Sequence, residues 1–170
     1  MEMKVRIATL GNGKFRACCP SLPGCTAVGE TKEEVWRKVT YCAAGHPGGA
    51  LQMADAIEHL PSTGPLLGSI EEAEWAERVL ELQPCQRLWL YTDGLIEAGV
   101  PHDKFDLQGL DRILQHTADR SLEEQASALL REAVSRQGRE AEDDVTIVGM
   151  ERLASNHREG GQLLTRAVYI

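Results

Sequence analysis

The stretch RLWLYTDGLIEA, residues 87–98, decides the fold of this chain. Pro84 precedes its apolar part, and Asp93-Gly94 follows it. A short apolar run bounded by turn signals is typical of a β-strand that is buried on both faces. We therefore predict a buried strand over residues 87–92.

Two helices are predicted downstream of this strand. Apolar residues recur at helical spacing over Leu107–Thr117 and again over Leu122–Arg136. The second helix also has a capping box, in which Ser121 and Glu124 are placed to satisfy each other's backbone N–H groups. The stretch DVTIVGM, residues 144–150, then predicts a closing strand.

More strands are predicted upstream. Gly11-Asn12-Gly13 suits a tight hairpin turn, so we expect a strand on each side of it. Thr31 and Glu34 form another capping box, which predicts a helix beginning near Lys32. Further strands are expected at residues 26–28, 39–45, 50–53 and 74–82, and in the tail stretch LLTRAVYI, residues 163–170.

A loop is predicted at residues 61–69, because Pro and Gly interrupt the stretch PSTGPLLGS. The acidic run that follows, residues 70–77, is interpreted as a solvated face. Strands come first, then paired helices, then a closing strand. This order predicts an α+β fold with mainly antiparallel strands and two adjacent helices on one face of a sheet.

The composition is that of a globular protein. Of 170 residues, 42% are hydrophobic and 26% charged, which excludes a disordered or collagen-like chain. Apolar runs are only a few residues long, far short of the roughly 20 that span a bilayer, so no membrane partner is expected. Charges scattered through the first residues leave no apolar signal segment, which favours a cytoplasmic location.

Charge divides the chain into two unequal parts. Residues 1–40 carry seven basic and four acidic side chains, a net charge of +3, whereas residues 41–170 carry 11 basic and 22 acidic side chains, a net charge of −11. The total of −8 argues against nucleic acid as the main partner. The asymmetry indicates two segments of different origin.

Five cysteines occur in the chain, and reduced thiols are expected for a protein without an export signal. Their spacing does not suit a zinc site, because Cys18 and Cys19 are adjacent, Cys25 follows six positions later, and the nearest histidine is His46. The cysteines are Cys18, Cys19, Cys25, Cys42 and Cys85.

Three carboxylates at predicted strand ends are candidates for a metal site. Asp93 follows one strand, and Asp143 and Asp144 precede another. Rigidly held carboxylate oxygens are what Mg²⁺ and Mn²⁺ prefer. The plainer alternative is that Asp93-Gly94 is a turn and Asp143-Asp144 a solvated charge pair.

Several motifs, taken in order, resemble the C-terminal half of bacterial PPM-type protein phosphatases, the clade that regulates sporulation and sigma factors. The resemblance covers residues 40–152. It is carried by YCAAGHPGG (41–49), STGPLLGS (62–69), LWLYTDGLIEA (88–98), the stretch 105–110 and EDDVTIVGM (142–150).

This resemblance implies a dinuclear Mn²⁺ or Mg²⁺ centre that activates a water to hydrolyse phosphoserine or phosphothreonine. By match to the motifs, Asp93 and Asp143 would be metal ligands. Asp144 would be a further ligand, or would orient Asp143 or a bound water. The two strands would be neighbours, so the carboxylates of Asp93 and Asp143 are expected to approach to roughly 4–5 Å between oxygens.

The family's first half, which carries its other metal ligands, has no counterpart in residues 1–40. The site would therefore be incomplete and its affinity for Mn²⁺ or Mg²⁺ weak. Two functions stay open: a phosphatase acting on a phosphorylated, anti-anti-sigma-like signalling protein, and a non-catalytic regulatory or protein-binding module. A half-sandwich also leaves an apolar sheet face to cover, which predicts a homo-oligomer.

A second resemblance concerns PSLPGCTAVGETKEEV, residues 20–35, which is similar to the N-terminal segment of HicB-like antitoxin domains. The predicted organisation is a HicB-like hairpin and helix at 1–39, a phosphatase-like half at 40–153 and a tail at 154–170. His46, in the turn after residue 45, is interpreted as structural, with contact to a phosphate or a metal as the alternative.

Overall fold

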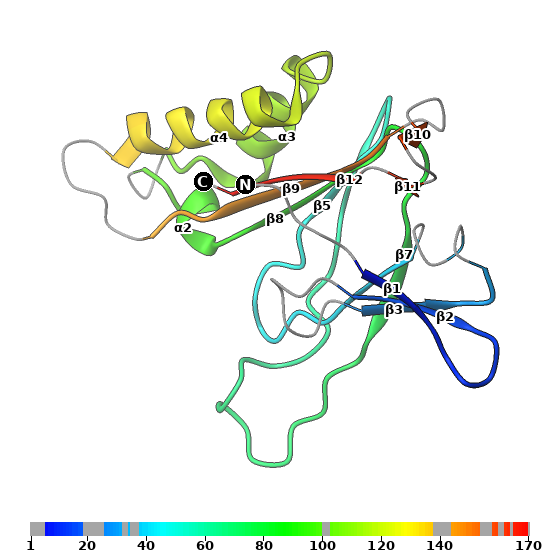
Figure 1. The fold of residues 1–170 in the computed structure, drawn as a ribbon. Coiled ribbons are helices and arrows are strands. Elements are labelled where there is room, and N and C mark those ends of the chain that lie inside the picture. Colours follow the sequence, from blue (N-terminus) through cyan, green and yellow to red (C-terminus); the bar gives the residue numbers. More distant parts are fainter. Residues whose placement is uncertain are drawn as a thin grey trace.

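A five-stranded antiparallel sheet forms the centre of the computed structural model, which describes residues 6–18, 26–31, 34, 38–99, 103–137, 144–153, 158–159, 162–163 and 165–169. The strand order is β12-β9-β8-β5-β6 (Figure 1). The strands are β5 (Ala50–Gln52), β6 (Ile57–His59), β8 (Arg87–Tyr91), β9 (Ile147–Arg152) and β12 (Thr165–Tyr169).

Strand β8 lies in the middle of this sheet and alternates between its two faces. Trp89 and Tyr91 belong to one hydrophobic cluster, and Leu88 belongs to another on the opposite face. Because successive side chains of a strand point to opposite sides, this division confirms the prediction of a strand buried on both faces.

Two helices cover the Trp89 face of the sheet, α3 (Asp106–His116) and α4 (Leu122–Gln137), as Figure 1 shows. Their predicted bounds are confirmed to within one residue at each end. The capping box of α4 forms as predicted: Glu124 N–H donates to Ser121 Oγ at 3.2 Å, and Ser121 N–H donates to Glu124 Oε2 at 2.9 Å. The α+β class and the antiparallel sheet are therefore confirmed.

A chain of buried hydrogen bonds joins the sheet to these helices. The Trp89 indole donates to Gln52 Oε1 at 3.0 Å, and Gln52 Nε2 donates to the Leu114 carbonyl at 2.9 Å. Gln125 Nε2 donates to the same carbonyl, and the Gln125 side-chain oxygen accepts from Arg87. Buried polar groups with partners avoid the cost of desolvation, so this chain of bonds sets the position of the helices on the sheet.

The opposite face of the sheet meets a smaller layer, the antiparallel pair β4 (Lys38–Tyr41) and β7 (Arg78–Glu81). Leu51 and Leu88 from the sheet are buried there with Leu60 and Leu82. Among the described residues, only the two short strands β4 and β7 cover this face, whereas two helices cover the other.

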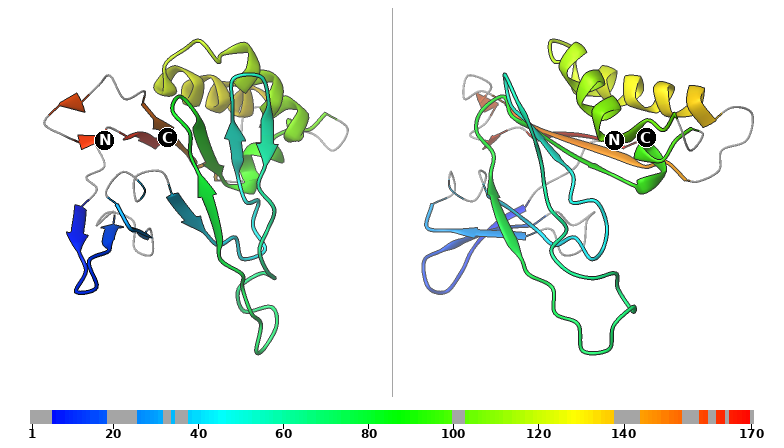
Figure 2. Two further views of the ribbon diagram at one scale, coloured as in Figure 1. Left: turned by 90° about the vertical axis from the view of Figure 1, so that its right-hand side faces the viewer. Right: turned by 180° about the vertical axis from the view of Figure 1, so that it is seen from behind.

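The N-terminal segment forms a separate three-stranded antiparallel sheet, β1 (Arg6–Thr9), β2 (Phe15–Cys18) and β3 (Thr26–Gly29). It lies on the side away from α3 and α4 in both views of Figure 2. The hairpin and the third strand are thus confirmed. Glu34 N–H donates to Thr31 Oγ1 at 3.1 Å, as a cap requires, but most of the helix predicted near Lys32 lies outside the described residues. A two-stranded pair, β10 (Arg158–Glu159) and β11 (Gln162–Leu163), precedes β12.

Several predicted bounds were wrong. Strand β6 was not predicted, since three residues are too few to show a period. The stretch predicted as a strand over 74–82 is a strand only at 78–81, and β9 begins at residue 147 instead of 144. The strand predicted over 39–45 ends at Tyr41, beyond which Ala44 makes an isolated parallel bridge to Gly64.

Cys42 and Cys85 carry free, exposed thiols, as predicted, and the other three cysteine side chains lie outside the described part of the chain. Within the described ranges, every helix is too short or too polar to cross a lipid bilayer.

Candidate functional site

One end of the central sheet gathers the predicted site residues. We call it the Asp93 edge: the end at which β8 stops and β5 and β9 begin. The antiparallel register pairs Trp89 with Ala50 and Tyr91 with Ile147. The residues after β8, those before β9 and the loop before β5 therefore meet at this end.

Thr92 joins the two segments that carry the candidate carboxylates. Its N–H donates to the Thr146 carbonyl at 3.1 Å, and its Oγ1 accepts from Thr146 N–H at 2.9 Å. The Thr92 hydroxyl also donates to the Asp144 carbonyl at 2.9 Å. A single side chain thus holds the segment before β9 beside the start of the segment that contains Asp93.

Asp93 is the first residue of a short helix, α2 (Asp93–Ile96), which was not predicted from the sequence. Leu95 N–H donates to the Thr92 carbonyl at 3.1 Å. Gly94 and Leu95 are buried and Asp93 is exposed. Burial of Leu95 against the core therefore forces a helical turn and leaves the Asp93 carboxylate at the surface, with its Oδ1 accepting Gly94 N–H at 3.2 Å.

Asp144 is exposed two residues before Thr146. The structure thus places Asp93 and Asp144 at one sheet end, and the two strands beside them are neighbours, as the resemblance implied. Asp143 lies outside the described residues, so its role as a ligand and its separation from Asp93 stay predictions.

The Asp93 edge offers carboxylate oxygens as possible donors to a divalent metal. Carboxylate oxygens suit Mg²⁺ and Mn²⁺, which take several oxygen ligands each. Among the described residues, no group of three or more His, Cys, Asp or Glu side chains comes together in a way that could hold an ion. Asp93 and Asp144 alone do not complete a coordination shell.

The loop at residues 45–49 borders the same edge and fits its surroundings closely. A Cβ on Gly48 would meet the Leu60 carbonyl, and one on Gly49 would meet the Trp89 carbonyl. Gly49 also has a φ of 107°, which favours glycine. The loop therefore packs against the residue that follows β6 and against the middle of β8.

Beside this loop lies a pocket of about 370 Å³. Apolar groups from several elements form much of its lining. They include Pro47, Leu60, Ile96 and Leu107.

Four polar side chains also line this pocket: His46, His59, Ser62 and Tyr91. From the sequence, His46 was interpreted as structural and the other three were assigned no function. His59 Nε2 lies 3.0 Å from a carboxylate oxygen of Asp111, on α3. Burial, and to a lesser extent the Asp111 carboxylate, raise the pKa of Tyr91 to about 12. The ring of His46 is exposed, with Nδ1 2.9 Å from the Pro47 carbonyl oxygen. The His59–Asp111 pair could not be predicted from the sequence, because the two residues are far apart in the chain.

Comparison with known proteins shows which family has this arrangement. A family model described as stage II sporulation protein E (SpoIIE) matches residues 12–153. The phosphoserine phosphatase RsbP of Bacillus subtilis strain 168 is 32% identical over 84 residues, which are 49% of this chain and 21% of RsbP. The chain therefore spans about a fifth of the length of this curated relative.

Two solved structures share the fold. The SiaA-PP2C domain of Pseudomonas aeruginosa superposes with a TM-score of 0.59 at 18% identity, over 81% of this chain and 51% of that domain. The PP2C phosphatase domain of SpoIIE from Bacillus subtilis, solved with a fragment of its regulatory domain, gives a TM-score of 0.58 at 17% identity, over 80% of this chain and 36% of that chain. At these identities the likeness shows a shared PP2C phosphatase fold.

Proposed function

The chain belongs to the stage II sporulation protein E (SpoIIE) family, and on that premise we propose that it is a phosphatase domain that acts on phosphoserine or phosphothreonine in a bacterial signalling protein. Membership of this family confirms that residues 40–152 resemble bacterial PPM-type phosphatases. The HicB-like resemblance of residues 20–35 and the three-part division of the chain stay predictions.

The observation that best supports this proposal is the Asp93 edge. Two exposed carboxylates, Asp93 and Asp144, lie at one sheet end, and Thr92 ties together the segments that carry them. They belong to the YTDG and DDVTIV motifs on which the family resemblance rests. The Thr92 hydrogen bonds hold the segment that contains Asp144 beside the residue that precedes Asp93, and the negative charge of the two carboxylates favours a divalent cation.

We propose that Asp93, Asp143 and Asp144 contribute to binding Mn²⁺ or Mg²⁺. The bound ions would supply an activated water for attack on the phosphoryl group. This chain's own part is to present oxygen donors at fixed positions, through the α2 turn and the Thr92 hydrogen bonds. Low affinity is expected, because the described residues supply too few ligands.

The proposed partner is a phosphorylated signalling protein of the anti-anti-sigma kind. RsbP, a phosphoserine phosphatase by name, supports this class of substrate. A cytoplasmic location would suit such a partner. We also propose a homo-oligomer, because the sheet face opposite the helices has only the small β4–β7 layer over it among the described residues.

A non-catalytic regulatory module is the second candidate. The observation that favours it is the absence of a three-residue donor group in the described ranges. Such a module would keep the phosphatase scaffold and bind the partner without hydrolysis.

Hydrolysis of p-nitrophenyl phosphate separates the two candidates. The purified chain is assayed in up to about 10 mM Mn²⁺ and in chelator, and its melting temperature is recorded under the same conditions, because a bound ion stabilises the folded state. The proposal predicts Mn²⁺-dependent turnover and a rise in melting temperature, both lost in Asp93→Asn. Asp119→Asn, a matched exposed change in the turn between α3 and α4, should retain both. A folded chain with neither response would leave the regulatory module as the function.

A further inference from the structure

A second feature, distinct from the Asp93 edge, is a loop with an uncovered apolar tip. We call residues 65–74 the apolar loop. Leu66, Leu67 and Ile70 are 61%, 69% and 57% exposed. Among the described residues, seven large hydrophobic side chains are exposed, and these three fall within five consecutive positions. Scattered exposed hydrophobics are ordinary, but a cluster of them marks an interaction surface.

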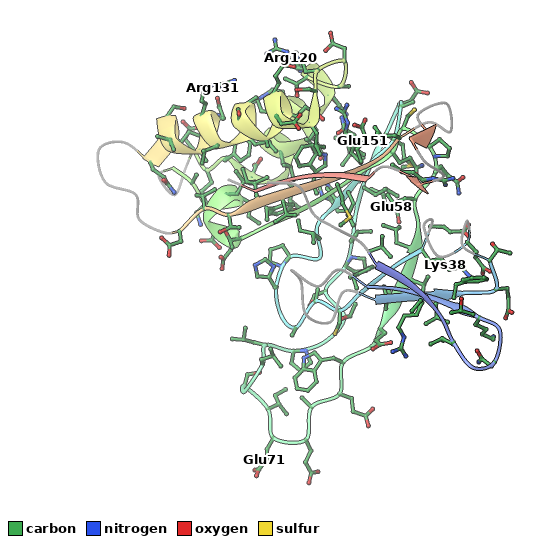
Figure 3. All side chains as sticks on the ribbon, in the orientation of Figure 1. Lys38, Glu58, Glu71, Arg120, Arg131 and Glu151 are labelled. Atoms are coloured by element: carbon green, nitrogen blue, oxygen red, sulfur yellow. The ribbon has the colours of Figure 1, made fainter. Side chains whose placement is uncertain are left out.

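The apolar loop projects away from the body of the protein. It extends on the side opposite α3 and α4 in Figure 1 and in both views of Figure 2. In Figure 3 the labelled Glu71 lies at its far end. The tip is therefore accessible to another molecule.

The base of the loop is fixed by specific contacts. The Trp75 indole donates to the Pro65 carbonyl at 2.7 Å, and Ala76 N–H donates to the Thr63 carbonyl at 3.0 Å. A Cβ on Gly64 would lie 2.5 Å from the Trp75 ring. Trp75 thus closes the two ends of the loop against each other.

The tip has its own hydrogen bonds. Ser69 donates to the Leu66 carbonyl through its N–H at 3.1 Å and through its hydroxyl at 2.6 Å. Gly68, with a φ of 79°, permits the turn between them. The apolar side chains are therefore displayed on an ordered turn, and a partner would bind them with little ordering cost.

Charge indicates the chemistry of the partner. Residues 60–77 contain four glutamates and no lysine or arginine. All four are exposed and lie next to the apolar tip or just beyond it: Glu71, Glu72, Glu74 and Glu77. A matching surface would have an apolar centre and a basic rim.

We propose that the apolar loop is a docking site for a partner protein that presents an apolar strip flanked by Lys and Arg. Leu66, Leu67 and Ile70 supply the buried contact, and the glutamates supply orientation and partner choice. Two loops from two copies would bring eight glutamates together, and an anionic membrane would repel the four, so both occupants are disfavoured. The docking site does not depend on whether the Asp93 edge is catalytic.

The test uses a designed 18-residue amphipathic peptide with a leucine face and lysine rims, against the same peptide with glutamate rims. Fluorescence anisotropy gives the affinity, and the indole N–H resonance of Trp75, assigned with W75F, reports the place of binding. The lysine peptide should bind the whole chain and shift this resonance, and the glutamate peptide should not bind. Leu66→Ser/Leu67→Ser/Ile70→Ser should weaken binding by at least about tenfold, since apolar contact area is lost.

The matched control is Val79→Ser/Val134→Ser, which removes two other exposed hydrophobics, 64% and 54% exposed, and should leave affinity unchanged. Equal binding by the triple serine variant would mean attraction by net charge alone and would overturn the proposal. Light scattering that shows a dimer of the wild type and a monomer of the triple variant would assign the loop to a second copy instead. Sedimentation of the wild type, but not of the triple variant, with phosphatidylglycerol vesicles would assign it to a membrane. Either result overturns the proposal.

Discussion

The two faces of the central sheet are buried to different extents. On the Trp89 face, helices α3 and α4 close a cluster of thirteen buried residues, and a chain of hydrogen bonds through Gln52 and Gln125 connects the layers. On the Leu88 face, the described residues include a cluster of only four buried ones, beneath a two-stranded layer. Buried apolar contact, and with it stability, is therefore concentrated on the helical side, while the other side has room for further contacts.

The strongest test of this difference removes the same side chain from each face. Leu129→Ala, in the helical cluster, should lower the free energy of unfolding by about 2–5 kcal/mol, because the truncation leaves a cavity in a fully buried site. Leu80→Ala, in β7 on the partly buried side, should cost distinctly less. Urea denaturation of both variants measures the two values. Equal losses would contradict the comparison.

A smaller loss of stability is expected from a change at Gly149, a residue of the sheet that packs tightly against the Trp89 ring. A Cβ on Gly149 would lie 2.6 Å from the Trp89 ring, so Gly149→Ala must displace the indole. Overpacking of this kind costs about 1–3 kcal/mol. The melting temperature and tryptophan fluorescence should both change. Gly11→Ala, at a position with no heavy atom near the added Cβ, is the control and should leave the fluorescence unchanged.

The Asp93 edge lies at one end of the central sheet. Thr92 connects its segments by hydrogen bonds. Thr92→Val keeps the shape of the side chain but removes its bonds to the Thr146 N–H and to the Asp144 carbonyl. A loss of about 1 kcal/mol is expected. Hydrogen exchange should accelerate at Thr146 and not in α4. Uniform acceleration across the chain would show that Thr92 has no local role.

The smallest effect concerns the cap of α4. Hydrogen bonds from the Ser121 backbone, and then its side chain, lower the pKa of Glu124. A lowered folded-state pKa adds stability above the ordinary glutamate value of about 4.3, and this stability is lost as pH falls through the folded-state value. Below about pH 4 the wild type should therefore lose its small advantage over Glu124→Gln, seen as converging melting temperatures. A difference that persisted at pH 2–3 would contradict the assignment.

Local patterns were sufficient for the elements that depend on neighbours in the chain. The apolar run at β8, the helical periods of α3 and α4, the Ser121–Glu124 cap and the hairpin around Asn12 were all predicted. Each rests on side-chain spacing or on hydrogen bonds across three or four residues, which a sequence displays directly. The placement of Asp93 beside a neighbouring strand does not belong to this class: it was implied by the resemblance of the YTDG and DDVTIV motifs to the phosphatase family.

Only the tertiary structure determined the features that join distant segments. The pair His59–Asp111 bridges β6 and α3, and the α2 turn forms because Leu95 must enter the core. A loop was predicted at residues 61–69, and the acidic run at residues 70–77 was interpreted as a solvated face, but the exposure of Leu66, Leu67 and Ile70 was not foreseen. Apolar residues in a sequence are equally consistent with core or surface, and only the packing of the whole chain decides which of them it covers.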